Sequence, residues 1–256
     1  MSKRRRFVII SVLLMMGFIA IQFLNDQNRF WAIGILGLLT AILFYWALLG
    51  SIKWNMTLLT LVLPVIFTLG VGVFWFLLPA NIFARIPVVI FYGAGIYILC
   101  LTANIYSVAA VRTIALLRAA RGVGFVLSLL TSFLVFDALL SLRTEIYFLV
   151  PLVFIISLPL YLQGYWSTLL DTKFSKDLII LSACAALITA EASAALYFWP
   201  VTVTVGSLFL TVSFYVLLGL GQAKIDGRLF PSTLREHLIV GTLVFIAMFI
   251  ATHWGA

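Results

Sequence analysis

Nine apolar stretches, each long enough to cross a lipid bilayer, dominate this chain of 256 residues. A bilayer core about 30 Å thick needs roughly 20 helical residues per crossing, and an apolar run at that depth satisfies its backbone groups inside a helix. The sequence therefore predicts an all-α polytopic integral membrane protein with about nine transmembrane helices. The stretches cover residues 7–24, 30–50, 55–78, 84–103, 122–141, 146–164, 178–198, 201–221 and 237–253.

The composition excludes the soluble classes of protein. Hydrophobic residues make up 64% of the chain and charged residues 9%, whereas soluble domains are about half apolar and a quarter charged. Soluble enzymes, disordered tails and disulfide scaffolds are therefore excluded. The longest piece between two apolar stretches, residues 104–121, is too short for a folded soluble domain. We expect residues 1–256 to form a single transmembrane helical-bundle domain.

The basic residues predict an orientation. If the N-terminus is cytoplasmic and the chain crosses nine times, nearly all Lys and Arg residues fall on the cytoplasmic side, as the positive-inside rule requires. The C-terminus then lies outside. The 16 basic residues divide into Arg29, Arg85 and Arg143 on the outer side, and Lys3, Arg4, Arg5, Arg6, Lys53, Arg112, Arg118, Arg121, Lys173, Lys176, Lys224, Arg228 and Arg235 on the inner side.

The net charge of +8 is explained by this asymmetry and by contact with anionic lipid head groups. Membrane lipids are therefore expected partners. Nucleic acid is not, because no basic groove with stacking aromatic residues lies outside the apolar stretches. The tryptophans agree with this interpretation, since they form an aromatic belt at the predicted outer ends (Trp31, Trp75, Trp199, Trp254) and inner ends (Trp46, Trp54, Trp166) of the crossings.

The first apolar stretch resembles a secretory signal, but it is long, and residues 22–26 offer no small-residue cleavage pattern. We expect an uncleaved first helix. Cys100 and Cys184 both lie within apolar stretches. For both we expect buried packing rather than a disulfide framework or a metal site.

The stretch 178–198 differs from the others because small residues dominate it. Small side chains let helix backbones approach closely, so packed helices gain from them and lipid-facing helices do not. Four of them repeat at every fourth position and form one flat ridge: Ser182, Ala186, Ala190 and Ala194. We place this helix at the centre of the bundle.

Glu191, in the same stretch, is the sharpest single feature of the sequence. A carboxylate at membrane depth costs about 2.5–3.5 kcal/mol on insertion scales, and no Lys or Arg within a crossing can pair with it. One interpretation is a proton-carrying or ligand-holding group. The other is a neutral acid that hydrogen-bonds neighbouring helices as structural glue. The sequence favours neither interpretation over the other.

Thr204, Ser207 and Thr211 share one face of the next helix. Pro200 should break the chain between the two helices, so that they pack antiparallel and Glu191 and Ser207 lie at comparable depth. A polar cluster around Glu191 is one expected outcome. The other is that these hydroxyls satisfy carbonyl groups of their own preceding turn.

Asp137 is the second acid within a crossing, about one turn from the outer end of the stretch 122–141. We expect it to reach the interface and pair with Arg143. If its helix neighbours the stretch 178–198, Asp137 and Glu191 would instead form a cation or proton site.

Residues 104–121 are rich in helix formers and contain neither Pro nor Gly. We predict an interfacial helix there, with Arg112, Arg118 and Arg121 toward the lipid head groups. Surface anchoring is favoured over a specific head-group or partner contact. Thr233 and Glu236 have the spacing of a capping box that opens the last helix.

Three segments, residues 104–120, 198–211 and 228–230, resemble a family of uncharacterised multi-pass membrane proteins from candidate-phyla bacteria. The likeness covers most of the chain. It implies a bacterial protein of the cytoplasmic (inner) membrane. It implies no established activity, so no catalytic residue is carried over.

Three functions stay open. The favoured one is transport or the handling of a lipid or small-molecule ligand, weakly supported by prolines within the crossings, because broken helices line transporter cavities. Its candidate ligand or proton site comprises Glu191, Thr204, Ser207, Thr211 and Asp137. The second function is a non-enzymatic structural or assembly component of the cell envelope, with a protein partner or a homo-oligomer.

The third function, an intramembrane enzyme, is the least favoured, because the chain contains no zinc-protease, nucleophile-elbow or P-loop motif. His237 and His253 are predicted at opposite membrane faces, where they cannot share a metal. We therefore expect no catalytic residue, no metal ligand and no cofactor.

Overall fold

The computed structural model describes residues 3–48, 54–78, 82–109, 115–170 and 175–252. Nine α-helices and the short 3-10 helix η1 (Trp75–Leu77) make up the regular structure of these residues. The α-helices are α1 (Lys3–Ile21), α2 (Asp26–Leu48), α3 (Trp54–Phe74), α4 (Ile82–Ala109), α5 (Leu117–Ser141), α6 (Ile146–Leu169), α7 (Lys176–Tyr197), α8 (Val203–Ile225) and α9 (Pro231–Ala251). The all-α class is confirmed, and each α-helix overlaps the stretch predicted for it.

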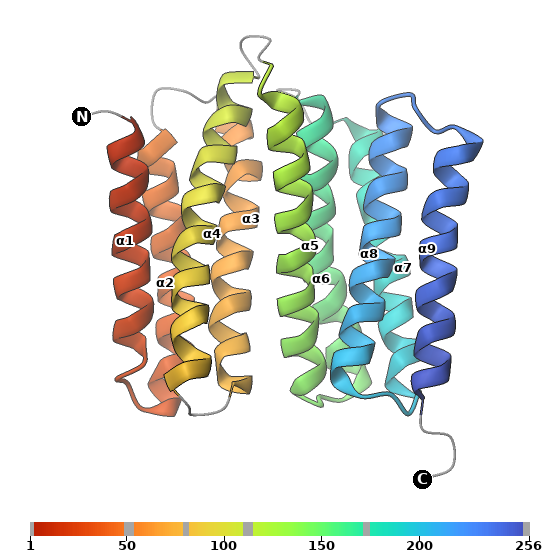
Figure 1. Cartoon of the computed structure of the whole chain (residues 1–256), viewed down its shortest axis with the longest axis horizontal. Coiled ribbons are helices and arrows are strands. Elements are labelled where there is room, and N and C mark those ends of the chain that lie inside the picture. Colours follow the sequence, from red (N-terminus) through yellow and green to blue (C-terminus); the bar gives the residue numbers. More distant parts are fainter. Residues whose placement is uncertain (1–2, 49–53, 79–81, 110–114, 171–174, 253–256) are drawn as a thin grey trace. The chain divides into compact units, whose positions relative to one another are not determined.

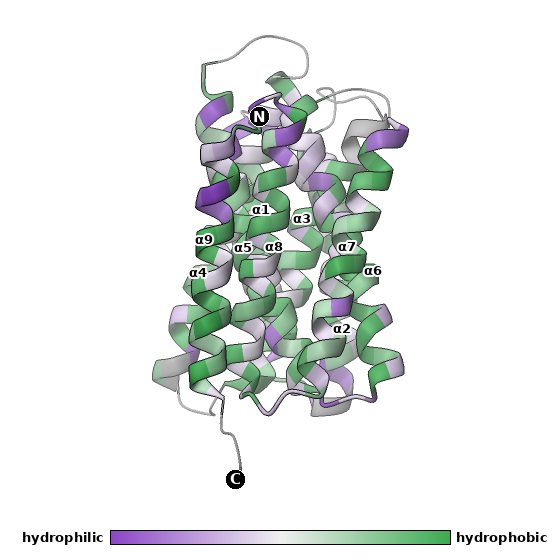
Figure 2. Ribbon diagram, turned by 90° about the vertical axis from the view of Figure 1, so that its right-hand side faces the viewer, coloured by the Kyte–Doolittle hydropathy of each residue, from purple (hydrophilic) through white to green (hydrophobic). Residues whose placement is uncertain are grey.

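Eight of these helices, α2 to α9, are long and apolar enough to cross a membrane. The first helix falls short because residues 3–6, at its start, are all basic and leave a shorter apolar run. Figure 2 shows hydrophobic residues along the bodies of the helices and hydrophilic residues gathered toward their ends. This pattern is that of a multi-pass membrane protein.

The chain divides into two compact units. Unit 1 comprises Met1–Val135 and Leu170–Thr172, and unit 2 comprises Phe136–Leu169 and Lys173–Ala256. The division falls within α5, so that Asp137 and the last residues of this helix belong to unit 2. A single bundle domain over residues 1–256 stays a prediction, and each unit is described by itself.

Unit 1 is held together by aromatic rings and by a chain of hydroxyl groups. Helix α1 packs against α2 and α4, and α3 packs against the same two helices (Figure 1). The Thr68 Oγ1 atom lies 3.2 Å from both the Thr40 Oγ1 atom and the Tyr92 hydroxyl oxygen, which joins α2, α3 and α4. Phe18 and Phe67 pack against the ring of Tyr92, and all five side chains are buried. Such hydroxyl pairs help to hold helices together in lipid, where water drives no association.

Unit 2 is built on the small-residue ridge of α7. Helix α7 packs against α6 and α8, and α8 packs against α6 and α9 (Figure 1). Ser182, Ala186 and Ala190 are at most 1% exposed, as a ridge pressed against neighbouring helices should be. The close approach also brings the Tyr161 hydroxyl of α6 to 2.8 Å from Thr189 Oγ1 of α7.

The placement of α7 at the centre of the bundle is wrong. Ile180, Leu187 and Ile188 on its opposite face are 49–60% exposed, because small residues occupy one side of this helix and large apolar residues the other. Cys184 lies on that exposed face, so its predicted burial is wrong too, whereas Cys100 is buried as expected.

Two local predictions also need correction. Residues 104–109 continue α4 and residues 117–121 begin α5, so the described part of the segment 104–121 forms no separate interfacial helix. The absence of a helix breaker, which suggested that helix, instead lets α4 run on. No capping box opens α9, because this helix begins earlier, with Pro231 in its first turn after Phe230, a position that suits proline. The break at Pro200 is confirmed, since α7 ends at Tyr197 and α8 begins at Val203.

Candidate functional site

A buried acid and a buried hydroxyl meet in unit 2. Asp137, near the end of α5, is 7% exposed, and Ser207, in the second turn of α8, is fully buried. The Ser207 Oγ atom lies 3.0 Å from the Asp137 Oδ1 atom. The expected pairing of Asp137 with Arg143 is wrong, since among the described residues the carboxyl group turns to Ser207 instead of reaching the interface.

The Ser207 hydroxyl has a second acceptor within reach. Its Oγ atom also lies 2.9 Å from the backbone carbonyl oxygen of Thr204. A hydroxyl carries one hydrogen and two lone pairs. It can therefore share its hydrogen between this carbonyl and an ionised Asp137, or donate to the carbonyl while it accepts a hydrogen bond from a protonated Asp137. Asp137 thus keeps a hydrogen bond in both of its protonation states.

The other two hydroxyls of the predicted polar face contribute less. Thr211 donates to the carbonyl oxygen of Ser207 at 2.7 Å, which is the backbone satisfaction weighed as the alternative. The Thr204 side chain is exposed. Of the three predicted hydroxyls, only Ser207 contacts an acid of another helix.

Glu191 lies apart from this pair. Its side chain is exposed on α7, on the same face as Leu187 and Ile188, and makes no hydrogen bond or ion pair with any described residue. Neither the predicted polar cluster around Glu191 nor the pairing with Asp137 is formed among these residues. Glu191 precedes Tyr197, the last residue of the helix, by six positions, or about 9 Å at 1.5 Å per residue.

A cavity of about 470 Å³ opens beside the buried pair, within unit 2. Leu140 and Gly206 line it and face each other, since a Cβ atom added to Gly206 would lie 3.2 Å from Leu140 Cδ1. Leu140 is about one turn beyond Asp137 on α5, and Gly206 directly precedes Ser207. The cavity therefore reaches to within about one helical turn of the carboxyl group.

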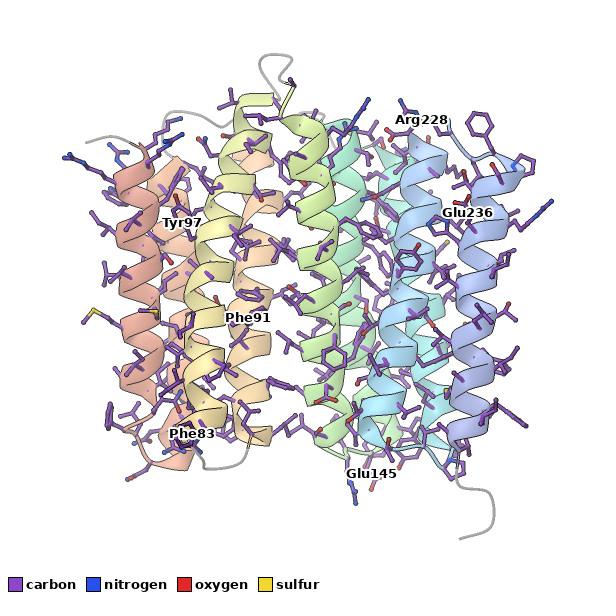
Figure 3. All side chains as sticks on the ribbon, viewed as in Figure 1. Phe83, Phe91, Tyr97, Glu145, Arg228 and Glu236 are labelled. Carbon is purple, nitrogen blue, oxygen red and sulfur yellow. The ribbon has the colours of Figure 1, made fainter. Side chains whose placement is uncertain are left out.

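Arg143 and Thr144 line the cavity from the turn between α5 and α6. Among the described lining residues, Arg143 is the one with a charged side chain. Figure 3 places Glu145, the next residue along the chain, at one end of unit 2, and Arg228 at the opposite end. Arg143 was predicted to lie on the outer side and to pair with Asp137, but neither Arg143 nor Thr144 was predicted to belong to a site. The rarity of basic residues on the predicted outer side was the available signal.

Two of the three arginines predicted to contact head groups, Arg118 and Arg121, lie near the start of α5. Arg118 is exposed and Arg121 is half-buried, both within the first turns of this helix. Arg112 lies outside the described residues. No group of three or more His, Cys, Asp or Glu side chains that could hold a metal ion occurs among the residues that the structure describes.

Comparison with known proteins gives a family. Residues 7–251 match the family described as "Protein of unknown function (DUF5656)", which agrees with the predicted resemblance to an uncharacterised family. No curated protein and no solved structure matches the chain. Because the family match extends over nearly the whole sequence, the chain belongs to DUF5656.

Proposed function

We propose that this protein binds and handles a small molecule in the outer leaflet of a bacterial cytoplasmic membrane, and that Asp137 is the acid that couples this handling to protons. The observation that carries the proposal is the buried Asp137–Ser207 pair, about one turn from a cavity of about 470 Å³. Small-molecule sites have volumes of roughly 300–1,000 Å³. Buried acids within membrane spans are expensive and typically mark proton or ligand pathways.

The membrane setting is part of the proposal. We infer nine crossings: the eight helices α2 to α9 and, in addition, α1. The N-terminus is then cytoplasmic and the C-terminus lies outside. The distribution of the 16 basic residues supports this orientation. In this arrangement the turn that carries Arg143 faces the outside, and the cavity opens toward the outer surface.

The hydrogen-bond geometry supports a proton-carrying role for Asp137. Ser207 can donate to the ionised carboxylate or accept from the protonated acid, with no change in the positions of the heavy atoms. The carboxyl group can therefore gain and lose a proton at little structural cost. In the proposed orientation the cavity connects Leu140 and Gly206, about one turn from Asp137, with the outer surface.

Infrared difference spectroscopy of the full-length protein in phosphatidylcholine nanodiscs tests this role. A protonated carboxyl band that titrates with pH should be lost in the variant Asp137→Asn. The matched control is Glu191→Gln, which removes an exposed acid without a partner in the described structure and should leave the band in place. Identical titrations of wild-type protein and Asp137→Asn would refute the proposal.

A second variant tests the cavity as the route to Asp137. Val203 lines the cavity, so Val203→Trp should fill it and slow hydrogen–deuterium exchange of the carboxyl band. Leu243→Trp, at a 61% exposed position of α9, is the control and should leave exchange unchanged. Equal exchange rates in the two variants would show that the cavity is not the route to Asp137 and would contradict the proposed coupling.

A further inference from the structure

The lining of the cavity in unit 2 has a polar end and an apolar part. The polar end is Arg143 and Thr144, in the turn between α5 and α6, whereas Leu139, Leu149 and Leu196 contribute aliphatic side chains from α5, α6 and α7. Such a lining suits an amphiphile, a molecule with one polar head and one apolar tail.

The polar end is arranged for a negative charge. Arg143 supplies the charge, and the Thr144 Oγ1 atom is buried with no hydrogen-bond partner in the described part of the chain. Helix α8 begins beside them with Thr202 as its N-cap, whose side chain makes no capping hydrogen bond. Helix α6 begins two residues after Thr144. The first turns of both helices leave N–H groups unpaired and carry the positive ends of the helix dipoles.

Acidic and phenolic groups border this site. Glu145 is exposed, and its Oε2 atom accepts a hydrogen bond of 3.4 Å from the Tyr197 hydroxyl group, whose ring lines the cavity. Asp137 lies about one turn from Leu140 and Gly206, which line the cavity. When ionised, Asp137 repels an anion in the cavity, and when protonated it does not. Anion binding and protonation of Asp137 should therefore favour each other.

We propose that the cavity binds an anionic amphiphile, with its carboxylate, sulfonate or phosphate head at Arg143 and Thr144 and its aliphatic chain along Leu139, Leu149 and Leu196. The coupling of this binding to protons rests on the proposed function of Asp137. The binding of the anion itself rests on Arg143 and on the shape of the cavity.

Calorimetric titration with decanesulfonate tests the ligand class, because the charge of this probe does not change with pH. The full-length protein is placed in phosphatidylcholine nanodiscs, and empty nanodiscs correct for partition into lipid. Wild-type protein should bind the probe at least about tenfold more tightly than decyltrimethylammonium, which has the same chain and the opposite charge.

Variants of the head-group end make the test specific. Arg143→Asn should weaken decanesulfonate binding about tenfold, the effect of removing one charge-assisted contact, while asparagine still tolerates the backbone conformation of this residue. Arg143→Lys should stay within about threefold of wild type. The control Arg228→Asn removes an arginine at the opposite end of unit 2 and should have no effect. Unchanged binding in Arg143→Asn, or equal affinity for the cationic probe, would overturn the inference.

The pH dependence separates this inference from the proposed function. Decanesulfonate should bind more tightly at low than at high pH over the range in which the infrared carboxyl band titrates. Asp137→Asn should reduce that difference, while Glu191→Gln, at an acid that does not line the cavity, should preserve it. If Arg143-dependent binding persists but its pH dependence is the same in Asp137→Asn, the proposed coupling fails and the ligand class stands. If Asp137 titrates in the infrared spectra but no probe binds, the inferred ligand class is wrong and the proposed proton-carrying role of Asp137 is still supported.

A last arm identifies the source of the head group. Replacing part of the phosphatidylcholine by phosphatidylglycerol should weaken decanesulfonate binding if an anionic membrane lipid occupies the cavity. Unchanged binding assigns the site to single-chain anions. Both results require Arg143, and a loss of the Arg143 dependence in either lipid would overturn the proposal.

Discussion

Arg143 adopts a backbone conformation that residues with a side chain rarely adopt. Its φ angle of 46° lies in the left-handed region, where the Cβ atom crowds the following carbonyl oxygen at a cost of about 1–2 kcal/mol. Such strain persists where the surrounding structure imposes it, and it is often found at functional sites. At this position the turn between α5 and α6 directs a charged side chain toward the cavity.

Two substitutions separate this strain from the charge of Arg143. Arg143→Val should lower the free energy of unfolding by about 1–2 kcal/mol, because a β-branched residue tolerates a positive φ angle poorly. Arg143→Gly should leave it within about 0.5 kcal/mol of wild type, since relief of the strain offsets the greater freedom of glycine in the unfolded chain. Unfolding in mixed micelles with increasing SDS measures both variants. Equal stabilities would show that the turn is not strained.

The two acids show where prediction from sequence stops at the residue scale. Counting residues from Pro200 places Glu191 and Ser207 at a common depth, but depth does not say which way a side chain points around the helix axis. Glu191 follows Leu187 and Ile188 by four and three positions, so it shares their face, away from the ridge. Asp137 meets Ser207 across 70 residues of sequence, a contact that no local pattern encodes.

At the scale of the element, α7 is a helix with two unlike sides. Ala190→Leu, on the buried side at 1% exposure, should lower the free energy of unfolding by about 1–3 kcal/mol, because added carbon atoms force the packed helices apart. Ala195→Leu, on the exposed side, should change it by less than about 0.5 kcal/mol. SDS-induced unfolding measures both. If Ala195→Leu proves as costly as Ala190→Leu, this face is covered by protein rather than by lipid.

Elements were predicted well wherever composition alone decides them. A run of about 20 apolar residues must be helical in lipid, so each α-helix of the described residues was predicted, and proline marked the break between α7 and α8. Several helix ends differ from the predicted bounds. Residues 104–109 could lie on a surface or extend α4, and their sequence suits both, so that only packing decides.

At the scale of the whole molecule, the testable feature is the number of crossings. If α1 spans the membrane with the other eight helices, the two ends of the chain lie on opposite sides. A tag at the C-terminus should react with a membrane-impermeant reagent in intact spheroplasts, and a tag at the N-terminus should react only after permeabilisation. Reaction of both tags, or of neither, in intact spheroplasts would mean eight crossings, with α1 at the surface.

The division into two units was not foreseen. Hydropathy counts helices, but it does not say which of them pack together, because that depends on the shapes of surfaces far apart in the sequence. Only the small-residue ridge of α7 predicted a close interface, and α6 and α8 do pack against this helix. The hydroxyl chain of Thr40, Thr68 and Tyr92 joins three helices of unit 1 and carries no periodic signal.

Helix α9 buries a single residue, Met248, and half-buries four others, Thr233, His237, Gly241 and Val244, on the side that packs against α8; its other residues are exposed. A flank that meets only fluid acyl chains has no fixed partner to fit, so leucine, isoleucine, valine and phenylalanine are interchangeable along it. Among members of the family, the sequence of this helix should therefore vary more than that of any other helix. Its hydrophobicity and length should be retained while the identity of its exposed apolar residues varies, and Met248 and the half-buried positions that face α8 should vary least.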